Sequence, residues 1–147
     1  MQIQFTNEQY KSLVKAVYLG NWMVNANLDE ENRETEYEEL LDYLLSQADA
    51  FDAKDLVEQD SESNSLVLTE EVEELIESYK ENYDQAAFWD SLIERLSFKE
   101  LTEIHGIEGL QKMEGQEIFE LMEKMADKYS TLLEEKGLDA LHVEGSV

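Results

Sequence analysis

The chain has 147 residues and no cysteine, and its 36 acidic residues against 11 basic ones give a formal net charge of -25. Without thiols, the chain cannot form a disulfide framework, a thiolate metal site or a cysteine nucleophile. The acidity argues against direct binding to nucleic acid or to an anionic membrane, because both require a basic surface. A basic protein is the partner that this charge favours.

The composition predicts a folded, soluble protein. A hydrophobic fraction of 42% with 10% aromatic residues argues against disorder, although 32% of the residues are charged. A chain of this length fits one domain, so we expect a single domain over residues 1–147 with a loose tail over about residues 139–147. The sequence has neither a secretion signal nor the ~18 uninterrupted apolar residues of a membrane span, which predicts a cytoplasmic protein.

The hydrophobic pattern has a helical period, and few residues interrupt it. The chain has no proline and only six glycines, the residues that most often end helices. Apolar residues recur at spacings of three and four along most of the sequence, as they do on one face of an α-helix. We therefore predict an all-α fold, a single compact bundle of about five helices.

A capping box marks the start of the first helix. Thr6 can cap the helix, and Gln9, three residues later, can reach back to it. Phe5 and Tyr10 occupy the positions of a hydrophobic staple across this start. These signals predict a helix over about residues 7–27.

A second capping-box pattern follows an acidic connector. Thr35 and Glu38 form this pattern, which predicts a helix from residue 35 to about residue 50. Residues 52–69 have the composition of a loop. We expect the polar stretch 60–65 to be mobile.

The following segment leaves one alternative open. Thr69 can cap a third helix, and the periodicity over residues 69–97 fits either one long helix or two helices that meet at Asp84. Ser97 and Glu100 form a third capping-box pattern, which predicts a short helix that ends near Gly106.

The last predicted helix is strongly amphipathic. Its apolar residues recur from Ile118 to Leu133 at helical spacing. Gly137, followed by Leu138, fits a glycine that ends the helix in a left-handed conformation. We therefore predict that this helix ends at about Gly137.

We predict no catalytic residue, no cofactor site and no metal site. The only histidines are His105 and His142, and neither follows a Glu by three residues as in di-iron helical bundles. No acidic run has the ligand order of a calcium-binding loop, and no glycine-rich phosphate loop occurs. We expect His105 to interact with free carbonyls at the end of a helix.

Two asparagines interrupt the apolar face of the first predicted helix. A buried asparagine must be hydrogen-bonded, so Asn21 and Asn25 either fix the packing of this helix or line a small polar pocket. The candidate pocket residues are Tyr18, Asn21, Trp22, Asn25 and His105. We favour the packing role, and the pocket would instead predict a small-ligand binder or an enzyme.

Glutamates are densest at the start of the third predicted helix. The candidate acidic interaction face consists of Glu70, Glu71, Glu73, Glu74, Glu77 and Glu81. Such a face predicts a non-enzymatic interaction module that engages a basic protein. Two alternatives stay open: an inhibitor of a nucleic-acid-binding protein, of the DNA-mimic or immunity type, and a face that only keeps the protein soluble.

Overall fold

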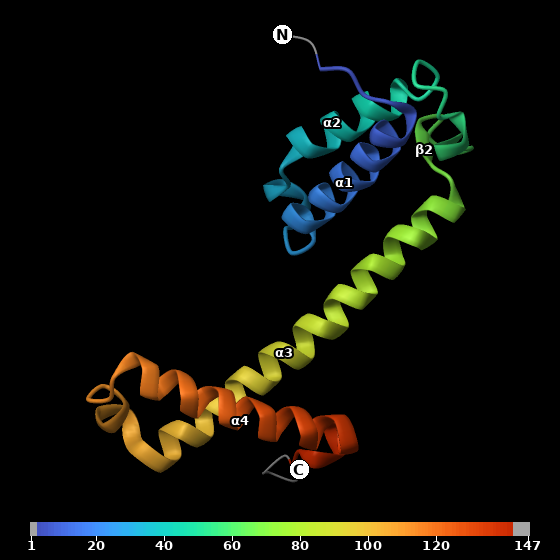
Figure 1. Cartoon of the computed structure of the whole chain (residues 1–147). Coiled ribbons are helices and arrows are strands. Elements are labelled where there is room, and N and C mark those ends of the chain that lie inside the picture. The colour runs from blue at the N-terminus through green and yellow to red at the C-terminus, as the bar shows by residue number, and fades with distance from the viewer. Residues whose placement is uncertain (1–2, 143–147) are drawn as a thin grey trace. The chain divides into compact units, whose positions relative to one another are not determined.

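A computed structural model describes residues 3–142 (Figure 1). Within this range 74% of the residues are helical, which confirms the all-α class. The elements are the α-helices α1 (Asn7–Asn25), α2 (Thr35–Ser46), α3 (Glu70–Leu110) and α4 (Gly115–Lys136), the 3-10 helices η1 (Glu30–Asn32), η2 (Lys54–Leu56) and η3 (Gly137–Ala140), and the strands β1 (Val57–Gln59) and β2 (Leu66–Leu68).

Contacts divide the chain into two units, Met1–Glu81 and Asn82–Val147, here called unit 1 and unit 2. Helix α3 contributes residues to both. The single domain stays a prediction, since this division does not test whether the units fold as one. Most of the predicted loose tail, residues 143–147, lies outside the described residues.

Helix α1 begins at the predicted capping box. The Thr6 hydroxyl accepts a hydrogen bond from the Gln9 backbone N–H, and the Gln9 side chain accepts one from the Thr6 N–H at 3.0 Å. Two of the free N–H groups at the start of the helix thereby find partners. The helix ends at Asn25, close to the predicted end.

The core of unit 1 joins four segments of the chain: α1, α2, the hairpin with the turn before it, and the start of α3. Tyr10 is 1% exposed, stacks on Phe51 with ring centroids 4.3 Å apart, and donates its hydroxyl hydrogen to the Leu44 carbonyl. The buried cluster consists of Tyr10, Val14, Leu41, Leu45, Ala53, Leu56, Leu68 and Ile76. These apolar contacts hold together segments that are far apart in sequence.

The predicted cap of α2 is wrong. Thr35 is the first residue inside the helix, and the N-cap position belongs to Glu34, whose side chain makes no capping hydrogen bond. The Glu38 carboxylate binds Arg33 instead of the Thr35 backbone. An opposite charge close by in the sequence therefore competes successfully with the cap.

The predicted loop 52–69 contains a short antiparallel hairpin, in which Glu58 pairs with Val67. Each strand has only three residues, too few to show the alternation that identifies a strand in a sequence. The stretch 60–65 forms the hairpin loop, where the Asp60 carboxylate accepts hydrogen bonds from the backbone of Glu62 and from Ser63.

Helix α3 resolves the alternative that the sequence left open, because Asp84 is helical and lies inside it. The predicted cap at Ser97 is wrong as well: this residue is fully buried within α3, and its hydroxyl donates to the Ile93 carbonyl at 2.7 Å. The helix is interrupted at Gly106, where φ is 70° and ψ is 159°, close to the predicted end. Only glycine adopts this combination readily.

Unit 2 is built on the rest of α3 and on α4. Its buried residues are Ser97, Leu101, Leu110 and Leu133. Glu100 on α3 accepts hydrogen bonds from Lys128 and from the Tyr129 hydroxyl on α4, both within 2.7 Å. Gly137 ends α4, which confirms the predicted position of the C-terminal glycine, although its φ of 55° and ψ of -144° differ from the left-handed helical conformation of a typical glycine cap.

Candidate functional site

Four of the five predicted pocket residues line one pocket of about 430 Å³ in unit 1. Its lining residues are Tyr18, Asn21, Trp22, Asn25, Ala26, Leu28 and Arg33. His105 does not line it. This histidine is part of unit 2 and occupies the last turn of α3 before Gly106, the helix-terminal position that the sequence predicts.

Asn25 acts as a clamp in this pocket. Its side chain is 5% exposed, accepts a hydrogen bond from the Glu34 N–H at 2.8 Å, and donates to Asn21 at 2.8 Å and to the Glu34 carbonyl at 3.4 Å. The Asn25 amide therefore bonds both the N–H and the carbonyl of Glu34, as the backbone of a neighbouring strand would. These bonds support the structural role of Asn25 over a role in ligand binding.

Trp22, at the rim of the same pocket, lies under a cation from α3. The Lys80 ammonium is 4.8 Å from the indole centroid and 2.6 Å from the Glu77 carboxylate. Only 14% of the Lys80 side chain is exposed. Its position fixes one face of the ring and neutralises one glutamate of α3.

The pocket has hydrogen-bond donors but no acid–base pair. Burial raises the pKa of Tyr18, and the nearby Glu73 carboxylate raises it further, so the hydroxyl stays protonated at neutral pH. Among residues 3–142, no histidine and no carboxylate line the pocket. Its side chains can therefore bind a polar group but lack a base for proton abstraction near neutral pH.

The predicted acidic interaction face lies on the first turns of α3 and is open to solvent. All six glutamates, Glu70, Glu71, Glu73, Glu74, Glu77 and Glu81, are exposed. Among the described residues only Glu77 is in an ion pair, with Lys80. Leu75 and Tyr79 on the same turns are 40% and 46% exposed.

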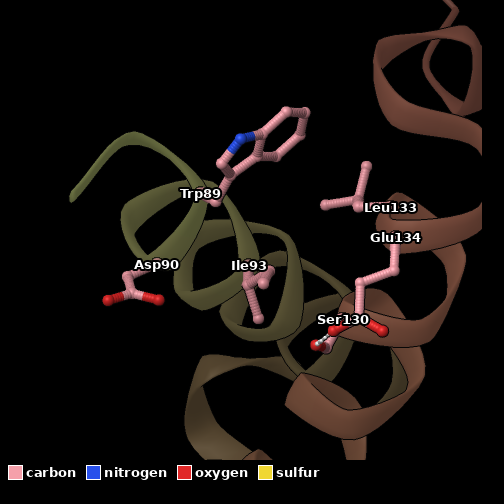
Figure 2. A pocket seen from close by; sticks show the side chains of 6 residues that line it. All are labelled: Trp89, Asp90, Ile93, Ser130, Leu133 and Glu134. Carbon is pink, nitrogen blue, oxygen red and sulfur yellow. Dashed lines mark hydrogen bonds between the residues drawn. The ribbon is translucent and has the colours of Figure 1, made fainter. Parts of the chain in front are cut away.

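Sequence reasoning missed a cleft of about 420 Å³ between α3 and α4 within unit 2. It is lined by Trp89, Asp90, Ile93, Ser130, Leu133 and Glu134 (Figure 2). The only signal in the sequence was the helical spacing of these residues, which is equally typical of a filled core. Which residues of two helices face each other depends on their packing, which the sequence does not specify.

The described part of the chain holds no cluster of three or more side chains able to bind a metal ion. None of its helices is both long and apolar enough to cross a bilayer. Comparison with protein-family models, with curated proteins and with solved structures finds no match to this chain.

Proposed function

We propose that the protein is a non-enzymatic interaction module whose acidic face on α3 binds a basic segment of another protein. The observation that carries the proposal is the lack of internal counter-charges. Within residues 3–142, five of the six glutamates of the face have no ion-pair partner. Their charges are left for an external cation, because an exposed and unpaired carboxylate keeps its full potential for a partner.

Two exposed apolar side chains lie on the same turns of α3 as the glutamates, but on another side of the helix. Leu75 and Tyr79 are four residues apart on α3, so they lie one above the other on the helix surface. Tyrosine is among the residues that contribute most to protein interfaces. Leu75 and Tyr79 therefore offer a separate apolar contact to a partner that reaches around the helix.

The test compares two triple variants of equal charge. One changes Glu70, Glu74 and Glu81 to Gln, and the control changes Glu117, Glu123 and Glu135 on α4, which are also exposed. The tagged proteins are used to capture partners from host lysate at low and high salt, and each captured protein is then purified and its binding measured.

We expect a basic partner whose affinity falls with salt and falls about tenfold or more in the first variant, with little change in the control. Equal losses in the two variants, or binding that does not respond to salt, would contradict the proposal. Adding duplex DNA to the purified complex separates the DNA-mimic alternative, because a partner whose DNA-binding surface is occupied will be displaced by DNA.

A further inference from the structure

The cleft of unit 2 has three apolar walls. Trp89 and Ile93 project from α3, and Leu133, which is 5% exposed, projects from α4 (Figure 2). The indole packs edge-on against Phe88, with ring centroids 5.0 Å apart and planes at 75°. These contacts fix the ring at the border of the cleft, so it can serve as a preformed wall.

A polar end closes one side of this cleft. The Glu134 side chain turns back toward Ser130 in Figure 2, and the Ser130 hydroxyl donates to Glu134 Oε1 at 3.2 Å. This bond leaves Glu134 Oε2 and the lone pairs of Ser130 Oγ as acceptors. The Asp90 carboxylate, also a lining residue, points away from α4 (Figure 2).

No basic side chain of the described residues forms an ion pair with the carboxylates of this cleft. None of the six lining residues is basic. In the part of the chain that the structure describes, neither Asp90 nor Glu134 takes part in an ion pair. The cleft thus combines apolar walls with an uncompensated negative end.

We propose that this cleft binds an alkylammonium group. The aliphatic chain lies against Trp89, Ile93 and Leu133, and the ammonium donates to Glu134 Oε2 and Ser130 Oγ. A volume of about 420 Å³ falls within the usual range of small-ligand sites and accommodates such a chain. This site shares no residue with the acidic face, so either proposal can fail without the other.

The acceptor geometry favours an ammonium over a guanidinium. A guanidinium binds a carboxylate best through both oxygens at once, and the bond from Ser130 already uses one lone pair of Glu134 Oε1. An ammonium is a compact charge with three donors and needs only separate acceptors. Its source is either a lysine side chain of a partner protein or a free amine.

Nuclear magnetic resonance of the full-length, nitrogen-15-labelled protein provides the test. The chain has two tryptophans, so the indole N–H signal of Trp89 is assigned by its loss in Trp89→Phe. The probes are pentylammonium, its neutral analogue 1-pentanol, and a capped lysine with and without acetylation of Nζ. We expect the charged probes to shift the Trp89 signal saturably and the neutral probes to bind about tenfold or more weakly.

Two variants of equal charge identify the group that holds the ammonium. Glu134→Gln should weaken binding of the charged probes by about threefold to tenfold, whereas the neighbouring Glu135→Gln should leave it unchanged. Tighter binding of the capped lysine than of pentylammonium assigns the source to a partner protein, and the reverse order assigns it to a free amine. An unmoved Trp89 signal, equal binding of 1-pentanol, or equal effects of the two variants would overturn the proposal.

Discussion

The two units bury their residues in different ways. Unit 1 joins segments far apart in sequence through a cluster of eight buried apolar residues, with further links such as the Asn7 side chain donating to the Phe51 and Asp52 carbonyls at 2.8 Å. Over its described residues, 82–142, unit 2 buries four, and the bonds of Lys128 and Tyr129 to Glu100 join its helices. Apolar burial therefore stabilises unit 1, whereas a polar link contributes a larger share of the stability of unit 2.

The two units also differ in their numbers of charged residues. Unit 1 carries 21 acidic and 5 basic residues, and unit 2 carries 15 and 6. The unit with the larger core thus also tolerates the greater self-repulsion. Each unit holds one tryptophan, Trp22 or Trp89, so fluorescence can follow the two separately.

Creating a cavity in the core of unit 1 should destabilise the protein more than any other change considered. Ile76 is fully buried, and Ile76→Ala should lower the free energy of unfolding by about 2–5 kcal/mol because it removes packed atoms and leaves a cavity. The measurement is chemical denaturation followed by Trp22 in a Trp89→Phe background. Ile3→Ala, at a residue of the same unit that is 69% exposed, is the control and should change it by less than about 0.5 kcal/mol. Similar costs in both would break the contrast between buried and exposed positions.

A smaller effect is expected from the clamp in the pocket of unit 1. Asn25→Ala should cost about 1–3 kcal/mol, because it removes a buried side chain and leaves the N–H and carbonyl of Glu34 without this partner. Asn21→Ala removes only one bond, to Asn25, and should cost about 1 kcal/mol or less. Thermal and chemical unfolding measure both values. A cost for Asn21→Ala as large as that for Asn25→Ala would contradict the clamp.

Removing the hydrogen bond of Tyr129 to Glu100, part of the polar link of unit 2, should change the free energy of unfolding least at neutral pH. Burial, and then the hydrogen bond to Glu100, raise the pKa of Tyr129 to about 12 from an ordinary value of 10.0. The folded state therefore keeps a proton that the unfolded state loses, so this contribution to stability is complete below pH 10 and is lost between about pH 10 and about pH 12.

Burial also raises the pKa of Tyr10 and Tyr18, so ultraviolet absorbance should show several tyrosines that ionise late, and Tyr129→Phe should remove the step near pH 12. The same variant should reduce the loss of unfolding free energy over this alkaline range. Tyr43→Phe, at a residue 62% exposed, should leave the step near pH 12 in place. If that step survives in Tyr129→Phe, the polar link is not its source.

Local signals predicted the helices well where no tertiary contact competes with them. The capping box at Thr6 and the glycine at Gly137 place the start of α1 and the end of α4 correctly. The failures at Thr35 and Ser97 have a different cause. At Thr35, the Glu38 carboxylate binds Arg33 and is not available to the cap. At Ser97, burial among the residues of unit 2 turns the hydroxyl toward the Ile93 carbonyl of its own helix.

The candidate sites show the same limit. The spacing of Tyr18, Asn21, Trp22 and Asn25 puts them on neighbouring turns of one helix, so the sequence could group them. His105 belongs to the other unit, and its grouping with these residues stays a prediction, because a sequence does not report proximity between distant segments. The sequence did not predict the cleft lined by Trp89 and Glu134, because its walls come from two helices that are separate in the sequence.

The backbone conformation at Gly106 makes this position sensitive to the chirality of the residue placed there. A Cβ atom placed there would meet no neighbouring atom within 4 Å, so bulk is not the obstacle. The obstacle is the sign of the dihedral angle, which an L-residue resists. The mirror image of this conformation lies in extended backbone that L-residues adopt, so a chemically made protein would accept D-alanine at residue 106 more readily than L-alanine.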